Sequence, residues 1–241
     1  MSDTAVASGF LERLGALTEL GGPVVMILLA MSVIAVAIIL LKLWQFAALG
    51  IHRAGFVDGV IEALRQGRAG EVDARLSGER NPIARVMETA IAERRHHPDN
   101  PMLVREEVTR VGTRHLEALR THLRGLEVIG SLSPLLGLLG TVLGMIEAFR
   151  QLEAAGSRVD PALLSGGIWE ALLTTAVGLA VAIPAIFALN WLERRVERFR
   201  HTMEDAVTRV FTQTSLTDPQ LAGGSGRPAE LAAAKRVADG H

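Results

Sequence analysis

The amino-acid sequence predicts an all-α integral membrane protein with three transmembrane helices and long cytoplasmic helical extensions. Apolar residues make up 49% of the 241-residue chain and are concentrated in three runs. Each run is long enough to cross a hydrocarbon core of about 30 Å. A chain of this length could not cover three helices that are apolar on all sides with polar layers, so a soluble core is disfavoured.

The first predicted span covers residues 23–41, after an amino-terminal arm of residues 1–22, and only Ser32 interrupts its apolar run. The alternative is a cleaved signal peptide, whose apolar core would be about 7–15 residues long behind a basic segment. Here the run is longer, and acidic residues outnumber the single upstream Arg13. A retained helix is therefore favoured, with the arm on the periplasmic side.

A charged segment, residues 42–127, follows the first span and is predicted to form cytoplasmic helices, because apolar residues recur in it at helical spacing. Asn81 before Pro82, and Asn100 before Pro101, predict helix starts with asparagine as the cap. The helix from Pro101 could run without interruption into the second span.

The second span, residues 128–149, and the third, residues 162–192, each carry a stripe of small residues and are joined by a short periplasmic loop, residues 150–161. Steps of four and three place such residues on one helix face. Membrane helices pack closely along small residues, because lipid supplies no hydrophobic force to drive them together. The first stripe is Gly130, Pro134, Gly137, Thr141 and Gly144, and the second is Ala171, Thr175, Gly178, Ala182 and Ala185.

The carboxyl-terminal part is predicted to be a cytoplasmic helix, residues 193–217, and a flexible tail, residues 218–241, that is rich in glycine and alanine. Arginines concentrate at the start of this helix and at the far end of segment 42–127, whereas the arm and the short loop carry few. The positive-inside rule then predicts a periplasmic amino terminus and a cytoplasmic carboxyl terminus.

Glu170 is the sharpest candidate for function, because a carboxylate within a span costs roughly 2.5–3.5 kcal/mol on insertion scales and usually faces protein or water. If a helix begins at Pro161, Glu170 lies more than two turns inside it. The alternative is that the helix begins only at Glu170, which would leave the carboxylate at the interface. The functional interpretation is favoured.

Three threonines could join Glu170 in a proton or ion route. Thr141 and Thr175 lie on the two stripes, whereas Thr174 lies four residues after Glu170 and shares its face. Each could instead bond back to its own helix, the common fate of a membrane threonine. Both Thr174 and Thr175 remain candidates for the route.

Several other classes of function are disfavoured. The chain has no cysteine, and its net charge of −1 argues against a nucleic-acid partner. No catalytic or phosphate-binding motif occurs, so neither an enzyme nor a cofactor is expected. The clustered histidines lack neighbouring ligands at metal-binding spacing and are assigned to the solvated surface; they are His96, His97, His115 and His122.

Two segments carry a resemblance: SPLLGLLGTVLGMIEAF (residues 133–149) and GGIWEALLTTAVGLAVAIPA (residues 166–185). They resemble the signature of the ExbB/TolQ branch of the MotA/TolQ/ExbB proton channel family, and the three-span plan agrees with it. The threonine of the family motif GTVxG falls on Thr141, the glutamate of GIAEAL on Glu170, and the threonine of LLxTA on Thr175. The sequence departs from the family with Trp169, where alanine is usual, and with the extra Thr174.

The resemblance implies an ExbB-like biopolymer transport protein of the bacterial inner membrane. It implies a homo-oligomeric ring, expected to be a homopentamer, around an ExbD- or TolR-like single-span partner whose membrane aspartate carries the proton. Proton motive force would then energise a TonB- or TolA-like protein for outer-membrane transport or envelope maintenance. The resemblance leaves open the ExbB or TolQ role, the cargo, the ring number and the choice between proton and sodium.

Two other classes of function remain as alternatives. One is a passive membrane scaffold whose stripes only pack helices. The other is an ion channel or transporter that needs no partner, although no inverted repeat of broken spans is present. A flagellar MotA-like stator is disfavoured because that branch has four spans.

Overall fold

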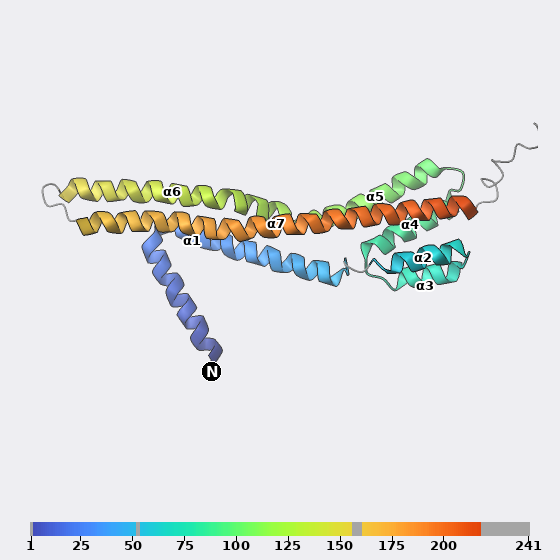
Figure 1. Cartoon of the computed structure of the whole chain (residues 1–241), viewed down its shortest axis with the longest axis horizontal. Coiled ribbons are helices and arrows are strands. Elements are labelled where there is room, and N and C mark those ends of the chain that lie inside the picture. Colours follow the sequence, from blue (N-terminus) through green and yellow to red (C-terminus); the bar gives the residue numbers. More distant parts are fainter. Residues whose placement is uncertain (1, 52–53, 156–160, 218–241) are drawn as a thin grey trace, which may run out of the picture. The chain divides into compact units, whose positions relative to one another are not determined.

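In the computed structural model the backbone is described for residues 2–51, 54–155 and 161–217, and side chains for 22–51, 54–154 and 164–213. The helices in these ranges are α1 (Ser2–Ala48), α2 (Phe56–Arg65), α3 (Ala69–Ser77), α4 (Pro82–His96), α5 (Pro101–Arg120), α6 (Leu123–Ala155) and α7 (Pro161–Thr217) (Figure 1). No strand occurs within these ranges, which confirms the predicted all-α fold. The predicted tail, the side chains of the arm and residues 156–160 of the short loop lie outside the described residues.

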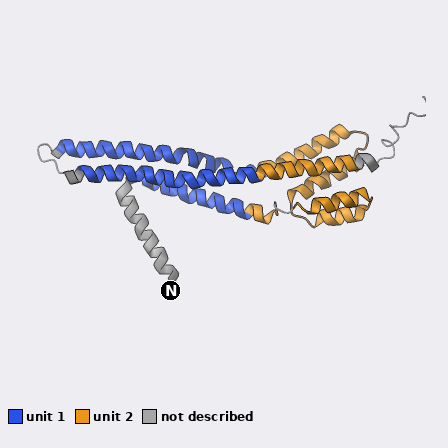
Figure 2. Ribbon diagram, viewed as in Figure 1, with its two compact units in different colours: residues 1–44, 120–195 blue, residues 45–119, 196–241 orange. Residues whose placement is uncertain are grey.

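Two compact units divide the chain (Figure 2). Unit 1 comprises residues 1–44 and 120–195, and unit 2 comprises residues 45–119 and 196–241. Unit 1 therefore holds the predicted spans, and unit 2 holds most of the charged segment between the first two spans.

Three helical stretches are long and apolar enough to cross a membrane, which confirms the predicted number of spans. They lie within Gly22–Ala48, Pro101–Ala154 and Leu164–Gln213. Large apolar side chains point outward from them, as at Ile183 and Phe187, which are 65% and 72% exposed. Apolar surface of this extent indicates contact with lipid or with other protein chains.

The first apolar helix begins at a break inside α1. Gly22 has φ 58° and ψ −164°, directly before Pro23. Glycine adopts a positive φ without steric cost, and proline is favoured at the first position of a helix. The helix then continues past the predicted end at residue 41, so that Lys42 is a buried member of it.

The junction between α5 and α6 differs from the sequence expectation. The helix that begins at Pro101 ends at Arg120, and α6 begins at Leu123. Between them His122 has φ 68°, a left-handed conformation that is uncommon for a residue other than glycine. The possible uninterrupted helix from Pro101 into the second span is therefore wrong, and no proline or glycine in the sequence marks this break.

Unit 2 packs short helices around an apolar core. Helix α3 contacts both α2 and α4, and the fully buried core side chains include Val60, Val72 and Met87. An ion pair joins Arg209 on α7 to Asp58 on α2, with 2.8 Å between Nη2 and Oδ1. These contacts give the unit an interior of its own.

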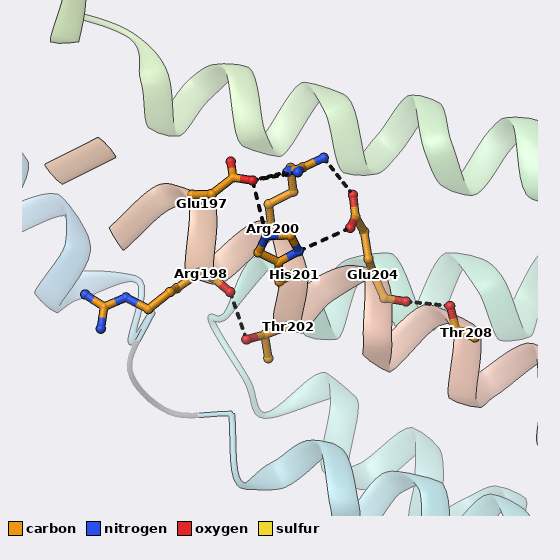
Figure 3. Close-up of polar contacts among 7 residues, drawn as sticks. All are labelled: Glu197, Arg198, Arg200, His201, Thr202, Glu204 and Thr208. Atoms are coloured by element: carbon orange, nitrogen blue, oxygen red, sulfur yellow. Dashed lines mark hydrogen bonds and ion pairs between the residues drawn. The ribbon is translucent and has the colours of Figure 1, made fainter. Parts of the chain in front are cut away.

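Charged side chains line the part of α7 that lies in unit 2 (Figure 3). Arg200 donates from Nε to Glu197 at 3.0 Å and from Nη1 to Glu204 at 3.2 Å. Pairs three and four residues apart each stabilise a helix by about 0.2–0.5 kcal/mol. They therefore support α7 beyond its apolar stretch.

Asn81 caps α4 and ties it to a preceding turn. Its Oδ1 accepts from the backbone N–H of Ile83 at 3.0 Å, and its Nδ2 donates to the carbonyl of Gly50 at 3.0 Å. The side chain is 1% exposed, so water cannot replace these bonds. The cap predicted from the Asn81 and Pro82 pair is confirmed, and so is the cap by Asn100, whose Oδ1 accepts from Leu103.

Replacing Asn81 with alanine is expected to destabilise unit 2 by about 1–3 kcal/mol, because it removes a cap and leaves buried backbone groups unpaired. Asn81→Asp keeps the cap acceptor but loses the donor to Gly50, so an intermediate loss is expected. The exposed Asn100→Ala is the matched control. Chemical denaturation of the three variants measures the order, and equal losses at positions 81 and 100 would contradict it.

Candidate functional site

Helices α6 and α7 meet backbone to backbone at two glycines. A Cβ placed on Gly178 would lie 2.6 Å from the carbonyl oxygen of Ser133 and 3.0 Å from the Cα of Gly137. A Cβ on Gly137 would lie 3.0 Å from the Cα of Thr175. Only glycine fits at such distances, so these two residues set the closest approach of the two helices.

Small residues continue this contact in both directions along the antiparallel pair. A Cβ on Gly144 would lie 3.0 Å from the Cβ of Ala171, and one on Gly130 would lie 2.6 Å from the side chain of Ile186. Ala182 and Ala185 on α7 are also buried. Three glycines of the first predicted stripe, and Ala171, Thr175 and Gly178 of the second, therefore lie in the α6–α7 contact.

Two members of the first predicted stripe lie beside this contact rather than in it. Pro134 and Thr141 are half-buried, whereas Ser133 and Gly140, each one position earlier, are buried against α7. From Gly130, steps of three and four residues lead through Ser133 and Gly140, whereas steps of four and three lead through Pro134 and Thr141. Both orders fit the sequence equally well. The structure selects the first order, so sequence reasoning missed Ser133 and Gly140.

The two candidate threonines of α7, Thr174 and Thr175, bring their hydroxyls within hydrogen-bond distance of α6. Thr174 Oγ1 lies 3.2 Å from the carbonyl oxygen of Gly137 and 2.7 Å from that of Ala171. Thr175 Oγ1 donates to the same Gly137 carbonyl at 3.0 Å. Thr174 is 3% exposed, and Thr175 is half-buried. The two candidates for the route therefore share one acceptor but differ in their access to the surroundings.

Thr141 stands apart from that pair. Its hydroxyl donates to the carbonyl of Leu138 in its own helix, with 2.6 Å between the oxygens. This is the local bond that membrane threonines commonly make. Among the described residues, no hydrogen bond joins Thr141 to Glu170, Thr174 or Thr175.

Glu170 lies in a groove at the end of the pair where α6 and α7 approach their connection. The groove has a volume of about 330 Å³ and is lined by Gly144, Glu147, Ala148, Gln151, Gly166, Gly167 and Glu170. Glu170 is exposed, and α7 begins nine residues before it, at Pro161. Thr175 lies five residues further on, about 7.5 Å along the helix axis.

A second carboxylate, that of Glu147, lines the same groove. Its Oε2 lies 3.3 Å from Nη1 of Arg150, and its Oε1 accepts a bond from Gln151 at 3.4 Å. The sequence does not reveal this neighbour, because the position of Glu147 near Glu170 depends on how the two helices cross. The groove thus combines two carboxylates, one of which is paired with a cation.

A family model described as the MotA/TolQ/ExbB proton channel family matches residues 78–205, more than half of the chain. This range includes all of α6 and the part of α7 that carries Glu170, Thr174 and Thr175. The site described above therefore lies within the matched region.

Three relatives illustrate the range of similarity. The Putative biopolymer transport protein ExbB-like 3 of Synechocystis sp. is 30% identical over 171 residues, which is 70% of this chain and 80% of that protein. The Biopolymer transport protein exbB1 of Vibrio cholerae is 44% identical over 85 residues, 34% of this chain and 37% of that protein. The Tol-Pal system protein TolQ of Pseudomonas aeruginosa is 37% identical over 147 residues, 61% of this chain and 52% of that protein. The last two matches span less than two thirds of the relative.

Proposed function

Because the chain belongs to the MotA/TolQ/ExbB proton channel family, in its ExbB/TolQ branch, we propose that it is a subunit of a proton-driven motor in the inner membrane of bacteria. In this proposal five copies of the chain form a ring around an ExbD- or TolR-like single-span partner. The ring couples the proton motive force to a TonB- or TolA-like protein for outer-membrane transport or envelope maintenance. The subunit acts without enzymatic chemistry.

One observation supports this proposal: α7 carries a carboxylate and, five residues later, a hydroxyl at its contact with α6. Glu170 lies in an open groove, and one to two turns further along α7 the Thr175 hydroxyl lies half-buried, 3.0 Å from the Gly137 carbonyl. A carboxylate can exchange protons with water, and a hydroxyl can both accept and donate a hydrogen bond without carrying charge. Together they would conduct protons between the groove and a carboxylate on the partner helix.

Charge supports the proposed orientation. Within unit 1, the start of α6 lies beside α1 and α7. A Cβ on Gly125 would lie 3.2 Å from Cδ1 of Ile38, and a Cβ on Gly130 would lie 2.6 Å from Cγ1 of Ile186. Arginines therefore gather at one end of the unit, where Arg124 follows the start of α6 and Arg194 follows the apolar part of α7. The opposite end carries the Glu147 and Glu170 groove. By the positive-inside rule the arginine end is cytoplasmic and the groove is periplasmic, with the amino terminus also outside.

Energetics favour a route used by several protons in succession. One proton that crosses a potential of 100 mV releases about 2.3 kcal/mol, so several protons must pass to do appreciable work on a partner protein. The carboxylate on the partner helix must therefore bind and release a proton many times in succession. Neutral threonine hydroxyls suit repeated transfer, because they add no fixed charge that would hold the proton in place.

Purification of the tagged chain from its own membranes tests the proposal. The expected result is a co-purifying single-span protein with an aspartate in its membrane helix. If the chain purifies alone but conducts protons after reconstitution, the partner-independent channel is correct. If it purifies alone and conducts nothing, the passive scaffold is correct.

A further inference from the structure

Two hydroxyls compete for a single carbonyl at the centre of the α6–α7 contact. Thr175 Oγ1 lies 3.0 Å from the Gly137 oxygen, and Thr174 Oγ1 lies 3.2 Å from the same oxygen. Thr174 has a second acceptor, the Ala171 oxygen, at 2.7 Å. Because a hydroxyl has one hydrogen, Thr174 donates to only one of these carbonyls at a time.

The Gly137 carbonyl has one acceptor position for the two hydroxyls. A carbonyl oxygen has two lone pairs, and inside α6 one of them accepts the backbone N–H four residues later, that of Thr141. When Thr174 donates to Ala171, Thr175 can donate to Gly137. When Thr174 donates to Gly137, the hydrogen of Thr175 must turn elsewhere.

The surroundings of the two threonines give them different roles. Thr174 is 3% exposed, and its Oγ1 would lie 2.5 Å from a Cβ on Gly140, so its side chain fills the space left by that glycine. Thr175 is half-buried, so part of its side chain is open to neighbouring groups. Of the two hydroxyls, that of Thr175 is therefore the one more open to a neighbouring group.

We propose that Thr174 is a positioning residue whose hydroxyl orientation decides whether Thr175 presents a hydrogen-bond donor or only an acceptor to the proton route. A hydroxyl that relays a proton accepts one hydrogen and releases another, and it must then turn its own hydrogen back. The Gly137 carbonyl holds the Thr175 hydrogen toward α6. When Thr174 donates to that carbonyl instead, the Thr175 hydrogen turns toward the proton route. The role in relay rests on the proposed function, whereas the competition for the carbonyl does not.

Infrared spectroscopy of the full-length Thr175→Cys variant tests the competition directly. The chain contains no cysteine, so the variant carries a single thiol whose S–H stretch reports its hydrogen bonding. With Thr174 present, two S–H bands are expected, one bonded and one free. In the double variant with Thr174→Val, which keeps the side-chain shape and removes the hydroxyl, only the bonded band is expected. Identical spectra in the two backgrounds would overturn the proposal.

Proton flux through the complex of the chain and its co-purifying partner tests the consequence. Thr174→Val is expected to slow the proton flux by up to about tenfold. A single neutral hydrogen bond can shift the ratio of the two Thr175 hydroxyl orientations by this factor. Thr174→Ser keeps the hydroxyl and is expected to conduct as the unsubstituted complex does. Equal slowing by valine and serine would assign the effect to packing and overturn the proposal. If the unsubstituted complex conducts nothing while the thiol bands differ as expected, the proposed function fails and the competition for the carbonyl stands.

Discussion

Thr175→Val is expected to abolish work that depends on the proton gradient while leaving the protein folded and assembled. Valine keeps the shape of threonine but can neither accept nor donate a hydrogen bond, so a relay through this position stops. Loss of a positioned proton-transfer group typically costs 10²-fold or more in rate. The bond to the Gly137 carbonyl, at 3.0 Å, contributes only about 1 kcal/mol to stability. In cells whose only copy of the subunit carries the change, growth that requires the motor measures the loss.

Thr175→Ser is the matched control, since it keeps the hydroxyl and should retain function. Glu170→Ala is expected to abolish function as well, because it removes a carboxylate from the groove. Immunoblots of the membrane fraction establish that each variant is present in normal amount. Normal growth of both the Thr175→Val and Glu170→Ala strains would remove these residues from the route and favour the passive scaffold.

Gly178→Ala is expected to destabilise the contact between α6 and α7. The added methyl group would lie 2.6 Å from the Ser133 carbonyl oxygen and 3.0 Å from the Cα of Gly137. These are backbone atoms and cannot turn away, so the helices must separate. Overpacking of this kind costs about 1–3 kcal/mol, and separation would also lengthen the bond from Thr175 to Gly137. Thermal unfolding of the purified chain in detergent measures the loss.

Gly166→Ala on the same helix is the control for Gly178→Ala. A Cβ at Gly166 meets no atom within 4 Å, while both substitutions gain the same helix propensity, about 1 kcal/mol. The difference between the two variants therefore isolates the helix contact. Equal unfolding temperatures would mean that α6 and α7 do not approach as closely as the structure has them.

The spans were predictable because their apolar length and small-residue spacing are local properties. Gly137 and Gly178 were recognised from the sequence, and they form the closest approach of the two helices. The choice between Thr141 and Gly140 was not recoverable, since steps of three and four in either order fit a helix with 3.6 residues per turn. The crossing of the two helices decides it, and a single sequence does not encode that crossing locally.

The roles of Thr174 and Glu147 depend on the partner helix in the same way. Sequence periodicity placed Thr174 on the face of Glu170, but it did not show that Thr174 is buried against Gly140 of α6. Glu147 joins Glu170 only because α6 and α7 are antiparallel neighbours at the groove. The break at His122 was equally hidden, because a left-handed histidine has no local sequence signal.

Proton flux into vesicles that contain the purified complex tests the central claim most directly. A pH-sensitive dye inside the vesicles reports proton entry when a membrane potential is imposed, once in buffer with sodium and once in buffer without it. The account predicts acidification that does not require sodium and that Thr175→Val reduces by roughly 10²-fold or more. Acidification that is unchanged by Thr175→Val, or a current carried only by sodium, would contradict it.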